Sequence, residues 1–371
     1  MWGKPGRGLL GAIALLLAGI FMSAADAATF VYVGNSESQD ITVFELKGNG
    51  ELAPVASVAV PGPAKPGGSM PMAVSPNKRF LYAALRNEPF SVASFAIDAK
   101  SGKLEHRGSS PLAASMAYIS TDRTGRFLFG ASYPSHKVTV NPIDPDGVVR
   151  APQEIISTEP HAHAIFTDSS NRYALYTSLG GDAGEGGVFQ AKFDAKTGKL
   201  SPNEPAVTRV KAKAGPRHLV LSPNKKFVYL LNELDASVYV FPYDAGKGTL
   251  GKESQVVSAL PKGFDGKPWA ADIHITPDGK FLYASERTSS SLAAYKVDGK
   301  NGTLTLIDNV VTEKQPRGFA IDPSGRYLLA AGQLSHSLTS YSIDKTSGKL
   351  TQLKQYPVGK NPNWIEIVSL R

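Results

Sequence analysis

The chain has 371 residues, of which 42% are hydrophobic and only 19% charged; this apolar content is sufficient for a large core and excludes wholesale disorder. The absence of cysteine excludes disulfides, thiol catalysis and any cysteine-ligated zinc or iron–sulfur site. The 40 basic residues against 32 acidic ones give a formal charge of +8, with few aromatic residues among the charges. We interpret this excess as a mild preference for anionic small molecules and not as a nucleic-acid-binding surface.

The N-terminus has the pattern of an export signal. Lys4 and Arg7 precede an apolar run from Leu9 to Met22, and an Ala-Asp-Ala string then offers a small-x-small cleavage site. The run is shorter than the roughly 20 residues of a spanning helix, and no later stretch approaches that length. We therefore predict a signal peptide over residues 1–27, an exported domain over 28–371 in the periplasm or outside the cell, and no membrane span after cleavage.

The rest of the sequence consists of repeats. One segment begins with Ser, Asp or Thr, here called the anchor, and continues through a turn to a basic and an aromatic residue. Its copies are SPNKRFLY, DRTGRFLF, DSSNRYAL, SPNKKFVY, TPDGKFLY and DPSGRYLL, with anchors at Ser75, Asp122, Asp168, Ser222, Thr276 and Asp322. A second segment, an acidic residue followed by a short glycine turn, occurs seven times. Intervals of 46 to 54 residues with alternating apolar patterns predict a β-propeller.

One unit shows how a blade is built. In residues 216–258, an inner strand over 218–221 is followed by a second strand over 227–231 and a third over 237–241, and the DAGKGTL turn leads into an outer fourth strand. Each run is short, β-branched or aromatic, and bounded by Gly, Pro, Asn or Asp, as strands are. The predicted blade therefore has four antiparallel strands, and no convincing amphipathic helix occurs after residue 27.

The incomplete first and last copies predict how the ring closes. FVYVGNSES near the N-terminus looks like a second strand without an inner one, and NPNWIEIVSL near the C-terminus looks like an inner strand without a second one. Pairing of Phe30–Gly34 with the C-terminal segment would complete one blade and cover otherwise open strand edges. The predicted fold is thus an all-β, seven-bladed propeller of four antiparallel strands per blade, which we expect to be a monomer.

The chemistry is expected at one end of the central channel. The anchor turns and glycine turns lie on one face and are interchangeable between blades, so they look structural, whereas the other face carries residues that differ. Positions five residues before the anchor and eleven after it form two rings at that second face. The first ring consists of Met70, Ala117, His163, Arg217, Ala271, Arg317 and Asn363, and the second of Ser36, Arg86, Tyr133, Leu179, Glu233, Arg287 and Gln333.

Titratable side chains are concentrated in these rings. Four arginines, one histidine and one glutamate belong to them, and five further polar residues stand nearby: His161, His218, Asp272, His274 and His336. Such a concentration at the mouth of a channel predicts an anion-binding pocket with candidate acid–base groups. We assign His163, Glu233, Arg217 and Arg287 as catalytic candidates, and His161, His218, Asp272, His274, Arg317 and Arg86 as substrate-binding candidates.

Less specific interpretations of the same residues remain open. An arginine can bridge two blades through a carboxylate, His163 can be a hydrogen-bonded structural residue, and Glu233 can be the ion-pair partner of Arg217. On a strand, His161 and His163 would share a face, but a catalytic zinc needs a third protein ligand and none is evident; we expect no metal and no cofactor. The run Gly180–Gly187 lacks the lysine and strand-to-helix context of a phosphate loop, so we expect a long loop over the pocket.

Three stretches carry a family resemblance: AGPRHLVLSPNKKFVYLLNELDASV, PWAADIHITPDGKFLYASERTSS and QPRGFAIDPSGRYLLAAGQLSHSL, over residues 214–238, 268–290 and 315–338. They resemble the seven-bladed propeller type of bacterial 6-phosphogluconolactonase, a family that also includes fungal carboxy-cis,cis-muconate cyclase, and the resemblance extends from residue 29 to 368. It implies metal-free hydrolysis of a sugar δ-lactone. It also implies an active site at His163, Arg217, Glu233 and Arg287, which are members of the two rings.

Two departures from the family pattern affect the expected substrate. The PHAH string at 160–163 is kept, but Ser178 stands where the family usually has Asp, and the loop that follows is enlarged. The export signal also separates this chain from cytosolic sugar-phosphate metabolism, which favours an unphosphorylated aldonolactone or another carboxylated lactone. A non-catalytic ligand- or partner-binding propeller and a muconate-type cycloisomerase are the alternatives. We expect His163 to be the base, and Glu233 either to orient it or to pair with Arg217.

Overall fold

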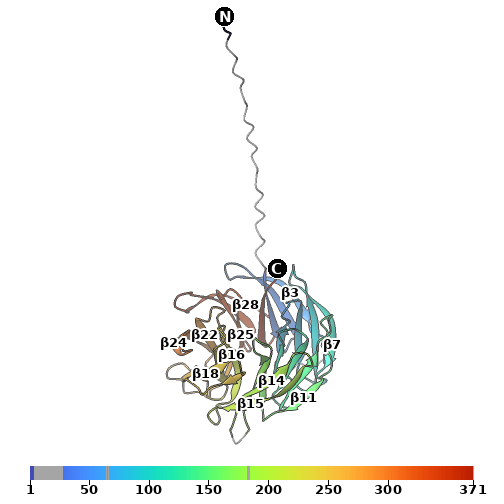
Figure 1. Cartoon of the computed structure of the whole chain (residues 1–371), viewed down its shortest axis with the longest axis vertical. Coiled ribbons are helices and arrows are strands. Elements are labelled where there is room, and N and C mark those ends of the chain that lie inside the picture. The colour runs from blue at the N-terminus through green and yellow to red at the C-terminus, as the bar shows by residue number, and fades with distance from the viewer. Residues whose placement is uncertain (4–27, 64, 66, 182–183, 371) are drawn as a thin grey trace.

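The computed structural model describes residues 1–3, 28–63, 65, 67–181 and 184–370, so most of the predicted export signal and residues 182–183 of the glycine-rich loop lie outside the described residues. All the elements named within that part of the chain are strands, and they form seven antiparallel sheets. The sheets stand in a ring around a central axis (Figure 1). The predicted seven-bladed propeller is confirmed. Nowhere in this part of the chain is there a helix of the length and apolarity needed to cross a membrane.

The strands follow the repeats in chain order. The closing blade contains β29 (Pro362–Ser369), β1 (Thr29–Asn35), β2 (Asp40–Leu46) and β3 (Leu52–Ala59). The next three blades contain β4 (Met72–Val74), β5 (Phe80–Leu85), β6 (Ser91–Ile97) and β7 (Leu104–Pro111); β8 (Tyr118–Thr121), β9 (Phe127–Ser132), β10 (Lys137–Pro142) and β11 (Glu154–Ser157); and β12 (Ala162–Thr167), β13 (Tyr173–Ser178), β14 (Gly187–Asp194) and β15 (Lys199–Arg209). The last three contain β16 (Pro216–Leu221), β17 (Phe227–Asn232), β18 (Ser237–Asp244), β19 (Thr249–Leu250) and β20 (Gln255–Ser258); β21 (Ala270–Ile275), β22 (Phe281–Glu286), β23 (Ser291–Val297) and β24 (Leu304–Val311); and β25 (Pro316–Ile321), β26 (Tyr327–Gly332), β27 (Ser337–Ile343) and β28 (Leu350–Pro357).

The blade over residues 216–258 differs from its predicted form at the outer edge. Its fourth strand is split, because β19 pairs with Tyr243 and Asp244 of β18 whereas β20 pairs with residues 237–240. The interruption falls at Pro242, which has no N–H to donate to a neighbouring strand. The three inner strands occupy the predicted segments with small extensions at their ends.

The two ends of the described domain meet in one blade. Strand β1 pairs antiparallel with β29, from Thr29 opposite Ser369 to Asn35 opposite Pro362. This register includes Phe30 opposite Val368, so the predicted closure by Phe30–Gly34 and the C-terminal segment is confirmed. With this pairing, β1 has a neighbour on both sides.

The contacts between blades explain why the two repeated segments recur. The Tyr32 hydroxyl donates to the Gly102 carbonyl of the next blade at 2.9 Å, and Tyr229 does the same to Gly302 at 3.0 Å. Both glycines have positive φ, and a Cβ on Gly102 would lie 2.2 Å from the Phe30 ring. Each glycine turn therefore lies beneath the aromatic side chains of the preceding blade, where a larger residue would clash.

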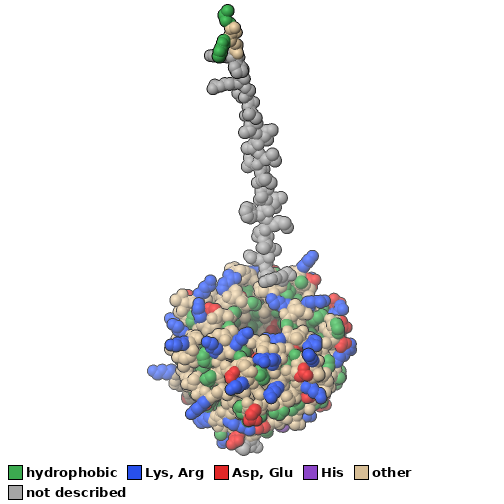
Figure 2. Space-filling view, viewed as in Figure 1, with side chains coloured by type: hydrophobic (Ala, Val, Ile, Leu, Met, Phe, Trp, Pro, Cys, Tyr) green, Lys and Arg blue, Asp and Glu red, His purple; other side chains and the backbone are tan. Residues whose placement is uncertain are grey.

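The excess positive charge is spread over the surface. On the face seen in Figure 2, lysine and arginine side chains are interspersed with aspartate and glutamate and do not gather into one basic patch. The distinctive arginines of the sequence are instead found at the inner ends of the blades, around the channel.

Candidate active site at the channel mouth

Side chains from the two predicted rings line one cavity of about 300 Å³. They come from the starts of the inner strands and the ends of the second strands, so they lie together at one end of the channel. The lining residues are Arg86, Ala117, Tyr133, His163, Arg217, Glu233, Trp269, Arg287 and Arg317. The structure thus brings together the four catalytic candidates and two of the substrate-binding candidates, Arg86 and Arg317.

Glu233 is the centre of the charged contacts. Its Oε2 accepts a hydrogen bond from Arg217 Nε at 2.8 Å. Its Oε1 accepts one from Trp269 Nε1 at 3.0 Å and lies 3.3 Å from Arg287 Nη2. Burial alone would raise the pKa of this carboxyl, but the arginines, Arg217 first, hold it below its ordinary value. Glu233 is therefore an ionised counter-ion shared by two guanidinium groups, and both oxygens are engaged.

Backbone carbonyls fix the orientation of these two arginines. Arg217 donates through Nη1 to the Ala271 carbonyl. Arg287 donates to the carbonyls of Trp269 at 3.0 Å and Ala270 at 3.1 Å, and its guanidinium lies 3.8 Å from the centre of the Trp269 ring. Because Arg217 and Arg287 are only 1% and 4% exposed, their planes cannot turn freely toward solvent. They form a rigid positive wall.

Arg86 and Arg317 have a different environment. Arg86 donates to Ser69 Oγ at 2.7 Å and Ser115 Oγ at 3.1 Å, and Arg317 donates to Ser69 Oγ at 3.3 Å. Among the described residues, no carboxylate lies within ion-pair distance of either. Burial and the nearby Arg217 lower the pKa of Arg86 to about 10 and that of Arg317 well below its usual range. The cavity therefore has four guanidinium groups and one carboxylate. A bound anion would reduce this excess of buried positive charge.

His163 is held neutral beside this charge. Its side chain is buried, its Nδ1 has no hydrogen-bond partner in the described part of the chain, and its Nε2 lies 4.0 Å from Glu233 Oε2. Burial first, and then the positive charge of Arg217, lower the pKa of His163 well below 6.5. An uncharged imidazole has one bare lone pair, so His163 can accept a proton at neutral pH.

His161 does not share the position of His163. Its backbone has a left-handed φ of 66° one residue before β12 begins, so the strand alternation expected for the pair is absent. Its ring instead stacks on Tyr133 at 4.3 Å, and its backbone N–H donates to His136 Nδ1. His161 supports Tyr133, a lining residue, and is not itself among the residues that line the cavity.

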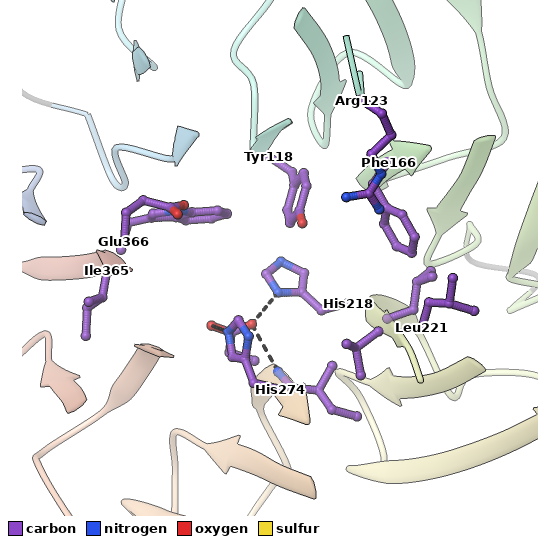
Figure 3. Close-up of a pocket in the computed structure, with 13 residues that line it drawn as sticks. Tyr118, Arg123, Phe166, His218, Leu221, His274, Ile365 and Glu366 are labelled. Atoms are coloured by element: carbon purple, nitrogen blue, oxygen red, sulfur yellow. Dashed lines mark hydrogen bonds and ion pairs between the residues drawn. The ribbon is translucent and has the colours of Figure 1, made fainter. Parts of the chain in front are cut away.

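The other three substrate-binding candidates, His218, Asp272 and His274, lie deeper in the channel than expected. They line a second cavity of about 270 Å³, shown in Figure 3. Asp272 accepts hydrogen bonds from His218 Nδ1 at 2.8 Å and His274 Nε2 at 3.1 Å. They lie deeper because they follow the mouth residues by one to three positions along strands that run away from the mouth.

Some residues around the channel were not identified from the sequence. Trp269 is 40% exposed and lines the mouth, but it precedes the inner strand and belongs to neither counted ring. Ser69, the shared partner of two arginines, precedes its ring position by one residue. Trp269 stands three residues before Asp272 in the string WAADIHI, which could have indicated it. Ser69 carries no sequence signal that we recognise.

In the part of the chain that the structure describes, no three His, Cys, Asp or Glu side chains come together as they would around a metal ion.

The chain is similar to known lactonases in sequence and in structure. The chain matches the family model described as lactonase, 7-bladed beta-propeller, over residues 30–367. It is 42% identical to a 6-phosphogluconolactonase of Pectobacterium carotovorum, over 92% of this chain and 98% of that protein, and 42% identical to one of Yersinia pestis, over 91% and 97%. Among solved structures, a periplasmic gluconolactonase of Pseudomonas aeruginosa is similar with a TM-score of 0.84 at 27% identity, over 93% of this chain and all of that one. A putative 6-phosphogluconolactonase of Bacteroides fragilis is similar with a TM-score of 0.82 at 28% identity, over 93% and 99%.

Proposed function

This chain belongs to the seven-bladed β-propeller lactonase family and is a lactone hydrolase of the 6-phosphogluconolactonase type, and from that premise we propose that the channel-mouth cavity is where it opens a sugar δ-lactone. The observation that carries this proposal is the pairing of a neutral, buried imidazole with four guanidinium groups around one cavity. Ester hydrolysis needs a base for water and positive charge for the developing oxyanion. The mouth supplies both.

His163 is the proposed base. Its free lone pair takes a proton from water while the water oxygen bonds to the lactone carbonyl carbon, giving a tetrahedral oxyanion. The ring C–O bond then breaks, and the protonated imidazole returns its proton to the ring oxygen, so the product is a hydroxy acid and the imidazole is neutral again. Glu233 is a poor base in comparison, because both of its oxygens are bound by Arg217, Arg287 and Trp269. Its proposed role is to hold the arginines.

The arginines divide into two proposed roles. Arg217 and Arg287 are fixed by Glu233 and by backbone carbonyls, so they suit stabilisation of an oxyanion whose position must be met without rearrangement. Arg86 and Arg317 lack a carboxylate partner among the described residues. They suit the grip on a permanent anionic group or on the carboxylate of the product.

The proposed natural substrate is an unphosphorylated aldonolactone met after export. The apolar run and cleavage pattern before residue 28 support export to the periplasm. A structurally similar protein is a periplasmic gluconolactonase. A 6-phosphorylated lactone is the second candidate, favoured by the two arginines that lack a carboxylate, Arg86 and Arg317.

The two substrates can be separated at Arg86. We expect the protein to accelerate hydrolysis of glucono-δ-lactone and of its 6-phosphate above the spontaneous rate. Arg86→Gln should raise KM by a factor of roughly 10–150 for the 6-phosphate alone, because a charge-assisted hydrogen bond contributes about 1.5–3 kcal/mol. Initial rates on both freshly made lactones, with Lys65→Gln as a surface control, measure this. An equal change in KM for both lactones would contradict a phosphate-binding role for Arg86.

The pH profile should reflect the lowered pKa of His163. Burial and the guanidinium groups of Arg217, Arg317 and Arg86 disfavour its protonated form, and a proton on the neighbouring His218 would disfavour it further. The active form is the neutral one, so activity is present above the folded-state pKa and lost as the pH falls through it. Because Glu233 is also held ionised, we expect kcat/KM to be constant from pH 8 to 6.5 and to fall only below 6.5. A midpoint at or above pH 6.5, after subtraction of spontaneous hydrolysis, would rule out His163 as the titrating base.

A further inference from the structure

The second cavity lies at the opposite end of the channel from the mouth. Its lining includes Leu221 at the far end of β16 and Arg123 in the turn that follows β8. That turn belongs to the face that looked purely structural in the sequence. In Figure 3, the side chains of Tyr118, His218, His274 and Glu366 surround a common space. The channel therefore has two separate cavities, one on each side of His218.

The same counting that gives the mouth rings gives two deeper layers. Four residues before the anchor position stand Pro71, Tyr118, Ala164, His218, Asp272, Gly318 and Trp364, and two before it stand Ala73, Ser120, Phe166, Val220, His274, Ala320 and Glu366. Aromatic, acidic and imidazole side chains in these layers come from several blades, and small residues from the blades between them occupy other positions. A channel serving only packing would be filled by apolar side chains from all blades. Here polar side chains, among them His218, Asp272 and Glu366, line the channel as well.

Several polar groups at this cavity have unused hydrogen-bonding capacity. His218 donates through Nδ1 to Asp272, which leaves its Nε2 as an acceptor, and this buried nitrogen has no partner in the described structure. Figure 3 shows it on the side of Tyr118. Glu366 accepts one bond from Trp364 Nε1 at 2.9 Å through Oε1. A buried nitrogen such as His218 Nε2 normally has a partner.

The charges of the cavity are nearly balanced. The Asp272 carboxylate accepts from His274, and although burial alone would lower the pKa of His274, Asp272 raises it above its ordinary value. Burial raises the pKa of Glu366 to about 7, so this carboxyl is close to half-protonated at neutral pH. The Arg123 guanidinium at the rim donates to the backbone carbonyls of Thr167 and Asp168. Unlike the arginine-rich mouth, this cavity has no large excess of either charge.

Aromatic rings form the apolar part of its wall. The Tyr118 and Trp364 rings meet edge to face at 5.3 Å, and Phe166 and Leu221 also line the space. The volume of about 270 Å³ is just below the range of about 300–1,000 Å³ that accommodates drug-sized ligands. A small molecule with hydroxyl groups around an otherwise apolar ring matches these features, since the aromatic faces cover the ring and the carboxyl, imidazole and phenol groups meet the hydroxyls.

We propose that the cavity formed by Tyr118, His218, Asp272, His274, Trp364 and Glu366 is a second binding site, specific for an uncharged hydroxylated ring of monosaccharide size. It is separate from the mouth and does not depend on the reaction proposed there.

Tryptophan fluorescence can test this site in the full chain. The sequence has three tryptophans, so the double variant Trp2→Phe, Trp269→Phe leaves Trp364 as the sole reporter. Titration with D-glucose, D-mannose and D-xylose should give a saturable change with at least one of them. D-gluconate and choline, as an anion and a cation of similar size, should give none. Failure of all three neutral sugars to produce saturation, or saturation by only gluconate or choline, would overturn the proposal.

Two variants of one residue distinguish hydrogen bonding from charge. In the same reporter chain, Glu366→Leu should weaken the binding of the responding sugar about tenfold by removing a hydrogen-bonding group. Glu366→Gln keeps that group without its charge and should stay within about threefold. Arg86→Gln in the mouth is the matched control and should leave the affinity unchanged. Equal affinity in Glu366→Leu, or weakening by Arg86→Gln, would place the binding elsewhere and overturn the assignment.

Discussion

Replacing His163 with alanine should lower kcat by a factor of about 100–10,000, the usual contribution of a positioned base. The side chain lines the mouth, has a bare lone pair at neutral pH, and lies beside the guanidinium groups of Arg217, Arg317 and Arg86, which disfavour its protonation. The remaining positive wall should still bind the lactone, so KM is expected to change much less than kcat. Initial rates on glucono-δ-lactone, corrected for spontaneous hydrolysis, measure both.

The matched control is another histidine. His106→Ala removes an exposed imidazole on β7, far from the mouth residues, and should leave kcat unchanged. Melting curves of both variants should establish that the fold survives. Glu233→Gln is a useful companion, because it leaves four guanidinium groups without a negative counter-ion and should disturb the alignment of Arg217 and Arg287. If both His163→Ala and Glu233→Gln retained near wild-type turnover, the mouth could not be the active site.

Removing residues 362–371 should abolish the cooperative folding of the ring. Strand β29 is the inner neighbour of β1, and the deletion would expose that whole edge. It would also remove the buried side chains of Ile365, Val368 and Leu370. Each fully buried aliphatic side chain contributes about 1.5–3 kcal/mol, so their sum is comparable with the total stability of about 5–15 kcal/mol of a typical protein. Solubility and thermal unfolding of the truncated protein measure the loss.

A single substitution separates the strand from its large aromatic side chain. Trp364→Phe keeps the β1–β29 backbone pairing and most of the ring contacts to Tyr118 and His218, so it should lower the melting temperature far less than the deletion. A truncated chain that stayed soluble and melted at the full-length temperature would show that closure by these two strands does not stabilise the fold.

The architecture could be predicted from the sequence because it is repetitive. Seven glycine turns and six anchor segments fix where each strand begins and ends, and the incomplete first and last units show which strands must pair. The same register predicts His163, Arg217 and Arg317 at one level around the axis, with Arg86, Glu233 and Arg287 beside them, and the structure has all six around one cavity. In a propeller, residues at equivalent positions of successive blades lie at the same height around the axis, so their spacing along the chain predicts where they lie.

The contacts within the site could not be obtained in this way. Spacing places Glu233 near Arg217 and His163 but does not decide which it binds; the structure has it 2.8 Å from Arg217 Nε and 4.0 Å from His163 Nε2. Trp269 lies before the repeat register and cannot be found by counting. Counting only two positions per blade also does not assign a depth in the channel to the inner-strand residues that follow them. For this reason the sequence predicts His218, Asp272 and His274 at the mouth.

His161 shows where prediction from strand alternation fails. The alternation rule assumes an extended backbone, and the sequence PHAH gives no sign that the chain turns left-handed at its first histidine. That one φ angle moves the imidazole from a position beside His163 to a stack on Tyr133. A single backbone torsion outside the strand was enough to separate two residues that the pattern had joined.

The closing strand pair also has a consequence for biosynthesis. Strand β1 is made first among the blade strands and its inner partner β29 is made last. At about 5–20 residues per second, their synthesis is separated by tens of seconds. Throughout that interval the nascent chain has an unpaired edge at β1 and an incomplete first blade. The ring can close only after β29 has left the ribosome, so the order of translation itself keeps the ring open until this strand has been made.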